Sequence, residues 1–259
     1  MQKRQAIFNF GMRPEQQSAV EKAVDYFQNF ANDPLNQDKI PHFLWNAKMR
    51  FGKTFAAYQL AKRMGWKKVL VLTFKPAVQN AWQEDLENHL DFQDWKFVTE
   101  EKDWQMNANF PQVCFGSFQD YLGKSKAGGI KLKNEWVHVI NWDCVVFDEY
   151  HYGAWRDKAK DLFADNDWEK EQSKQQKAEE HEMELDSPNY FDEELLPITT
   201  DHYLYLSGTP FRAINSGEFI EEQIFNWTYS DEQKAKNTWE GEDNPYLALP
   251  KMVMLTYQL

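Results

Sequence analysis

The stretch that decides the fold is HFLWNAKMRFGKTFAA, residues 42–57, in which a polar turn with a glycine separates an apolar run from an alanine-rich segment. The apolar run at 42–47 predicts a short strand. The segment at 53–65 has helical apolar spacing and ends in a glycine, which predicts a helix. The turn reads A-K-M-R-F-G-K-T and fits the phosphate-loop pattern G-x-x-x-x-G-K-[ST], with Ala47 in place of the first glycine.

A loop of this kind binds phosphate groups because backbone N–H groups and the helix N-terminus converge on them. Lys53 is expected to supply a flexible positive charge to the β- and γ-phosphates, and Thr54 a hydroxyl to Mg²⁺. The remaining residues expected to contact the nucleotide are Met49, Arg50, Phe51 and Gly52. A surface turn that contains G-K-T by chance is the alternative, and a second site has to decide between them.

The second site is CVVFDEYH, residues 144–151, where a predicted buried strand ends in two carboxylates. The end of such a strand lies at the edge of the sheet where α/β folds bind ligands. Asp148 is suited to hold Mg²⁺, directly or through water, and Glu149 to orient and polarise an attacking water. The alternative is that the two residues are only a solvated acidic strand end, which would explain an Asp-Glu pair found in isolation. Together with the phosphate loop, however, the pair predicts ATP hydrolysis with Lys53, Asp148 and Glu149 as the catalytic residues.

The rest of the chain alternates between strand-like and helical stretches. Residues 67–74 form a continuous run rich in valine and leucine, which is typical of a strand buried on both faces of a parallel sheet. Further strands are expected at 95–100, 112–118, 142–149, 201–207 and 251–257, and further helices at 13–31 and 76–90. This alternation predicts an α/β domain with a mostly parallel sheet and helices on both faces.

Length and composition are those of a globular protein. The 259 residues are 42% hydrophobic, which is enough for one large domain or two small ones. No apolar run approaches the roughly 20 residues needed to cross a bilayer, and the N-terminus lacks the apolar region of a signal peptide. A cytoplasmic protein without a membrane partner is therefore expected. Cys114 and Cys144 are expected to be buried, inert thiols, and the six histidines lack metal-ligand spacing.

The net charge of −12 is concentrated in one segment. Residues 164–194 hold 12 of the 41 acidic residues and 3 of the 29 lysines and arginines, so the rest of the chain is close to neutral. A near-neutral body can still present a local basic groove to nucleic acid. Residues 155–197 show little apolar periodicity and predict a solvated helical insertion or a mobile arm, with partner docking as the alternative.

Three motifs in this order resemble those of superfamily 2 helicases and translocases of the DEAD/DEAH type. AKMRFGKT resembles motif I, DEYH resembles motif II in its D-E-x-H form, and SGTP at 207–210 resembles motif III. MRPEQQSAV resembles the R-P-x-Q element that recognises adenine in this superfamily, and residues 69–86 resemble motif Ia. YLSGTPFR is similar to the motor domain of type I and type III restriction enzyme R subunits, which is the closest grouping.

The resemblance implies a RecA-like motor domain that uses ATP and Mg²⁺. It implies that Gln16 reads adenine with Arg13 as its neighbour. It also implies that His151, Ser207 and Thr209 couple the nucleotide site to the nucleic-acid site. The alternative for His151 is a purely structural role. The alternative for Ser207 and Thr209 is a helix cap or a turn.

The expected partner is double-stranded DNA, with RNA as the alternative. By resemblance, the loops that contain Lys75, Pro76, Ser117 and Gln119 should face the nucleic-acid backbone. Lysine and main-chain N–H groups bind phosphate there without reading sequence. An ordinary exposed lysine is the alternative at position 75.

Two features depart from the family pattern. Arg50 stands where the family usually has a small residue, so its long cationic side chain could add a phosphate contact or obstruct the loop.

The second departure is that no motif IV–VI series follows SGTP. Residues 1–259 are therefore interpreted as the first ATP-binding domain. A linker is expected from about 239 towards a second RecA-like domain in the same or another chain.

Without the second domain, ATP turnover should be slow or absent. An arginine finger from such a domain is worth about 10³–10⁵ in rate. A nucleotide-binding scaffold or regulatory module with little hydrolysis is the alternative function. A phosphate-loop kinase or GTPase is disfavoured, because D-E-x-H is followed by S-G-T-P and the sequence has no guanine-reading N-K-x-D element.

Overall fold

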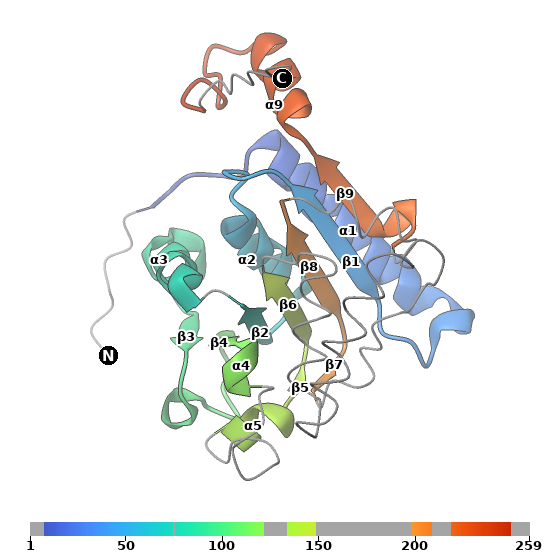
Figure 1. Ribbon diagram of the computed structural model, residues 1–259, viewed down its shortest axis with the longest axis vertical. Coiled ribbons are helices and arrows are strands. Elements are labelled where there is room, and N and C mark those ends of the chain that lie inside the picture. Colours follow the sequence, from blue (N-terminus) through green and yellow to red (C-terminus); the bar gives the residue numbers. More distant parts are fainter. Residues whose placement is uncertain (1–7, 75, 122–133, 149–197, 209–218, 250–259) are drawn as a thin grey trace, which may run out of the picture.

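The architecture is a parallel sheet of seven strands with helices on both faces (Figure 1). The computed structural model describes residues 8–74, 76–121, 134–148, 198–208 and 219–249. The strand order is β3-β4-β2-β6-β8-β1-β9, and all neighbours are parallel. The strands are β1 (His42–Ala47), β2 (Lys68–Thr73), β3 (Lys96–Val98), β4 (Gln112–Ser117), β6 (Cys144–Asp148), β8 (Tyr203–Ser207) and β9 (Ile224–Trp227). A separate parallel pair joins β5 (Asn141–Trp142) to β7 (Thr199–Thr200).

The helices form a layer on each face of the sheet. One layer consists of α1 (Pro14–Asn32), α2 (Lys53–Met64) and α3 (Gln79–Asn88), and the other contains α4 (Phe118–Tyr121) and α5 (Glu135–His138). Short 3₁₀ helices span Pro34–Asn36, Pro76–Val78, Leu90–Phe92, Glu101–Asp103 and Glu221–Gln223. Helix α9 (Tyr229–Asn237) follows β9 and lies beyond the carboxyl ends of the strands (Figure 1). This arrangement is the RecA-like α/β fold that the resemblance implied.

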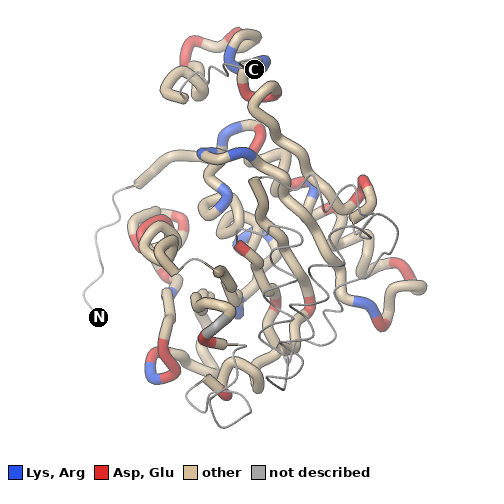
Figure 2. The backbone as a smooth tube through the Cα atoms, viewed as in Figure 1, with Lys and Arg blue, Asp and Glu red and all other residues tan. Residues whose placement is uncertain are grey.

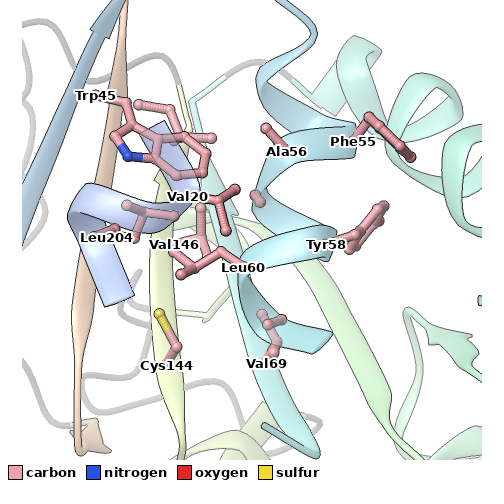
Figure 3. Close-up of a cluster of buried hydrophobic side chains, with 14 of the residues drawn as sticks. Val20, Trp45, Phe55, Ala56, Tyr58, Leu60, Val69, Cys144, Val146 and Leu204 are labelled. Carbon is pink, nitrogen blue, oxygen red and sulfur yellow. The ribbon is translucent and has the colours of Figure 1, made fainter. Parts of the chain in front are cut away.

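The alternation of side chains along β2 explains why its sequence is continuously apolar. Val69 and Val71 join the core against α1, α2 and α3, whereas Leu70 and Leu72 join the core on the opposite face. On the first face, Leu60 of α2 packs in the same cluster as side chains from β6 and β8 (Figure 3). Each buried aliphatic side chain contributes about 1.5–3 kcal/mol, so the two cores fix the sheet between the helix layers.

Most expected elements are confirmed. The strands expected at 42–47, 67–74, 95–100, 112–118 and 201–207 correspond to β1, β2, β3, β4 and β8, and the helices expected at 13–31, 53–65 and 76–90 correspond to α1, α2 and α3 with its preceding 3₁₀ turn. The strand expected at 142–149 is divided into β5 and β6 at Asp143. At this residue the chain passes from the separate β5–β7 pair into the seven-stranded sheet, and the Asp143 carboxylate accepts hydrogen bonds from the backbone N–H groups of Lys67 and Lys68.

Other expectations have different outcomes. The insertion at 155–197 and the strand at 251–257 lie outside the described residues. The sequence did not predict β9 as a strand, yet it pairs with β1 and completes one edge of the sheet. Cys114 and Cys144 are buried free thiols, as expected, and burial raises the pKa of Cys114 to about 12. Within the described ranges, no helix has both the length and the apolar character to span a membrane.

Candidate functional site

Residues 48–52 connect β1 to α2, where the sequence predicts the phosphate loop. Arg50 has φ 66° and Gly52 has φ 80°, so two of these residues adopt the left-handed backbone conformation. That conformation costs a residue other than glycine roughly 1–2 kcal/mol, and such strain is typical of functional loops. The side chains of Met49 and Arg50 are both exposed. The loop thus accommodates the unexpected arginine with a left-handed backbone and a side chain turned towards solvent.

Helix α1 holds this loop from one side. The Gln16 side-chain amide donates a hydrogen bond to the Phe51 carbonyl at 2.8 Å and accepts one from the Arg13 backbone N–H at 2.8 Å. The Arg13 guanidinium donates to the same Phe51 carbonyl at 2.6 Å. Gln16, which is expected to read adenine, and its neighbour Arg13 therefore both contact the phosphate loop directly. Adenine recognition by Gln16 itself stays a prediction.

Ser207 and Gly208, the described part of motif III, also lie near this loop. Ser207 pairs with Asn46 in the parallel register of β8 and β1 and is completely buried. A Cβ atom added to Gly208 would lie 3.8 Å from the Ala47 carbonyl oxygen and 4.0 Å from Lys53 Nζ. Lys53 Nζ in turn donates a hydrogen bond to the Ala47 carbonyl at 2.8 Å. The ammonium group of motif I and the glycine of motif III are thus neighbours.

Asp148 lies at the same carboxyl edge of the sheet as the phosphate loop. It ends β6, which is separated from β1 only by β8. Parallel neighbours are about 4.8 Å apart, so the strand end that carries Asp148 and the start of the loop are on the order of 10 Å apart along the sheet. The Asp148 side chain is buried, and Oδ2 accepts a hydrogen bond from the Trp82 indole N–H at 2.8 Å. The two sites on which the nucleotide interpretation depends therefore face the same end of the sheet.

The donor set at this edge fits magnesium. Mg²⁺ prefers hard oxygen ligands and is usually bound by one or two carboxylates together with waters and substrate phosphates. Asp148 offers a carboxylate, and Thr54 offers a hydroxyl in the first turn of α2. Across the described ranges, no group of three or more histidine, cysteine or acidic side chains is arranged so that it could hold a metal ion.

Four predicted site residues lie outside the described residues: Lys75, Glu149, His151 and Thr209. Their predicted roles stay predictions.

The predicted nucleic-acid loops lie at the ends of neighbouring strands. Thr73 of β2 pairs with Ser117 of β4, and Pro76 begins the 3₁₀ turn that follows β2. Gln119 lies in α4. The Ser117 hydroxyl is buried and donates to the Asp120 carboxylate at 2.8 Å. The structure therefore brings the two loops to one edge but engages Ser117 in holding α4.

Two buried carboxylates beside the loop were not predicted. Lys48 Nζ donates a hydrogen bond to Glu232 of α9, and the Tyr246 hydroxyl donates to Glu15 at 2.8 Å. Burial, and then the bond to Glu15, raise the pKa of the Tyr246 phenol above its ordinary value. Figure 2 shows basic and acidic segments close together at the end of the molecule that carries α9, at the top of the view. The pairs join positions 184 and 231 residues apart, so no local pattern in the sequence could have indicated them.

Comparison with known families identifies the chain. Residues 9–185, which include the phosphate loop and Asp148, match the family described as "Type III restriction enzyme, res subunit". The chain belongs to this family. The match confirms the resemblance to restriction enzyme R subunits that the sequence indicated.

Individual relatives of the res-subunit chain are longer proteins. It is 36% identical over 268 aligned positions to a Mycoplasma pneumoniae protein named as the C-terminal part of a type II restriction enzyme and methyltransferase. That alignment covers 95% of this chain and 35% of the relative, so the chain spans about a third of its length.

Two solved structures are similar at 12% sequence identity. The Sulfolobus solfataricus SWI2/SNF2 ATPase core in complex with double-stranded DNA has a TM-score of 0.49, covering 82% of this chain and 35% of that one. A nuclease-deletion mutant of the Type ISP restriction-modification enzyme LlaGI in complex with a DNA substrate mimic has a TM-score of 0.47. That alignment covers 89% of this chain and 21% of the LlaGI chain.

Proposed function

We propose that this res-subunit domain binds ATP with Mg²⁺ and hydrolyses it as the first motor domain of a DNA translocase or helicase. The observation that carries the proposal is that the phosphate loop and Asp148 lie at one edge of one sheet, two strands apart. Gly208 of motif III lies against the loop between them. The loop N–H groups and the N-terminus of α2 would bind the phosphates, and Lys53 would place its charge on the β- and γ-phosphates.

Each proposed role follows from the chemistry of the side chain. Asp148 and Thr54 would hold Mg²⁺, which would neutralise charge on the phosphates. Glu149 would orient and polarise the attacking water. Gln16 and Arg13 would fix the loop backbone and meet the adenine base from α1.

The proposed partner is double-stranded DNA. Lys75, Pro76 and Gln119 come directly after the neighbouring strands β2 and β4 in the sequence, and there they would contact backbone phosphates without reading sequence. His151, Ser207 and Thr209 would couple that contact to nucleotide state. The packing of Ser207 against β1, and of Gly208 against Lys53, supports a coupling role for motif III.

Residues 1–259 are proposed to act with a second RecA-like domain in a cytoplasmic protein. A second domain would supply the arginine that speeds phosphoryl transfer by about 10³–10⁵. The 259-residue chain alone should therefore bind ATP and turn it over slowly.

The test measures ATP turnover by the full-length protein with and without linear double-stranded DNA. DNA should stimulate turnover, and both Lys53→Ala and Glu149→Gln should abolish it. Turnover that is unchanged by every DNA and RNA tested contradicts a motor function. If Lys53→Ala abolishes the biological function and Glu149→Gln leaves it intact, nucleotide binding without hydrolysis is sufficient and the scaffold function is favoured.

A further inference from the structure

A buried tryptophan outside the three signature motifs contacts Asp148 directly. Trp82 lies on α3, and its indole N–H donates to Asp148 Oδ2 at 2.8 Å. Trp82 is 1% exposed and Asp148 is 8% exposed, so the bond is shielded from water. A hydrogen bond to an ionised carboxylate is stronger than one between neutral groups, and a buried carboxylate without donors is costly.

Trp82 is itself held in place by the helix that begins at the phosphate loop. The Tyr58 hydroxyl of α2 donates to the Trp82 carbonyl at 2.8 Å. The two rings meet edge to face, with centroids 5.3 Å apart and an interplanar angle of 89°. Tyr58 is four residues after Thr54, so both lie on one face of α2. A continuous series of contacts therefore joins the helix that carries Thr54 to the carboxylate of motif II.

The pairing of Trp82 with a carboxylate is not imposed by burial of the indole. The buried indole nitrogens of Trp45, Trp104 and Trp227 have no hydrogen-bond partner among the described residues. The Trp142 indole instead donates to the backbone carbonyl of Val137 at 3.0 Å. These four buried indoles donate to a backbone carbonyl or to no described group. Burial of an indole in this fold therefore does not by itself require a carboxylate partner such as the one that Trp82 has.

We propose that Trp82 is a positioning residue that orients the Asp148 carboxylate for Mg²⁺. The inference rests on the proposed function, because it concerns the metal of the same nucleotide site. Hydrogen-bond partners of metal-ligating side chains fix the orientation of the ligand, and their loss typically lowers metal affinity about 10- to 100-fold. Loss of the Trp82 N–H removes one donor that orients the Asp148 carboxylate, so the carboxylate should hold the metal less tightly.

The experiment removes the N–H group and keeps the ring. In the 259-residue chain, Trp82 is replaced by phenylalanine and, separately, by β-(3-benzothienyl)alanine, which preserves the shape of tryptophan but has sulfur in place of N–H. Binding of a fluorescent non-hydrolysable ATP analogue is titrated with Mg²⁺ and repeated in EDTA. The Mg²⁺ concentration for half-maximal binding should rise about 10- to 100-fold, with binding in EDTA unchanged.

Trp142→Phe is the matched control, because it removes an indole N–H from a backbone carbonyl in the core on the opposite face of the sheet. It should leave the Mg²⁺ dependence as in the wild type. If Trp82→Phe fails to fold, as judged by circular dichroism, the benzothienyl variant decides.

The failures of the two proposals are distinguishable. Wild-type protein that binds no nucleotide, or binds it without Mg²⁺ dependence, overturns the proposed function and this inference with it. Wild-type binding that depends on Mg²⁺, together with an unchanged Mg²⁺ requirement in the Trp82 variants, overturns the positioning role alone. Equal weakening in Mg²⁺ and in EDTA assigns Trp82 a packing role and also overturns it.

Discussion

The side-chain amide of Gln16 donates to the Phe51 carbonyl at 2.8 Å, immediately before the glycine of the phosphate loop. A Cβ atom added to Gly52 would lie 2.5 Å from Gln16 Nε2, and the backbone of Gly52 is left-handed, with φ 80°. An alanine at this position would therefore require the Gln16 side chain to move away from the loop.

Gly52→Ala should separate the loop from α1. Gly65 provides the matched control, because its φ of 73° is also left-handed but nothing lies within 4 Å of an added Cβ. Gly65→Ala should lower the free energy of unfolding by roughly 1–2 kcal/mol and leave nucleotide affinity unchanged. Gly52→Ala should lose more stability and weaken nucleotide binding at least about 10-fold. Urea unfolding and nucleotide titration measure the two effects, and equal behaviour of the variants would falsify this account of the loop.

Lys53→Ala should weaken ATP binding while the fold is retained. A charge-assisted hydrogen bond contributes about 1.5–3 kcal/mol, which corresponds to an affinity loss of about 10- to 150-fold. Lys62→Ala is the control on the same helix, because Lys62 is exposed and pairs only at the surface, at 2.8 Å from Asp91. Its removal should change affinity less than about 2-fold. Isothermal titration with ATP measures both, and a similar small change for the two variants would contradict the role of Lys53.

The sequence allowed the site to be placed because its motifs are local and follow strands. Residues 42–57 show strand, loop and helix in one stretch, and parallel strands bring their carboxyl ends to one edge. The position of Asp148 relative to the phosphate loop followed from those two facts. The strand order itself did not, because pairing partners depend on contacts between distant segments.

The contacts around the loop could not be predicted, for a related reason. Glu232 lies on an exposed-looking polar helix, α9, and only its pairing with Lys48 explains why it is 1% exposed. Trp82 lies within the segment that resembles motif Ia, yet nothing in its spacing indicates Asp148 as its partner. Such pairs are determined by packing between elements.

Asp85 should make stability fall as the pH rises. Burial raises its pKa from 3.8 to about 6, with His89 lowering the pKa and Glu84 raising it by smaller amounts. The folded state then holds this proton more tightly than the unfolded state, so the group's contribution to the free energy of unfolding declines from about pH 4 to about pH 6. Asp85→Asn should flatten that decline, whereas Asp94→Asn, at an exposed position, should keep it. Urea unfolding across this range measures both slopes, and parallel wild-type and Asp85→Asn curves would contradict the prediction.

The ion pair between Lys48 and Glu232 should couple α9 to the phosphate loop. Their side chains are 15% and 1% exposed, so removal of one partner leaves a buried charge without compensation. Glu232→Gln and Lys48→Met should each cost about 3–5 kcal/mol. The double variant should cost less than their sum by at least about 1 kcal/mol. Glu222→Gln, at an exposed position, should stay within about 0.5 kcal/mol of the wild type. Urea unfolding of the wild type, the two single variants and the double variant completes the cycle, and strictly additive losses would show that the two side chains act independently.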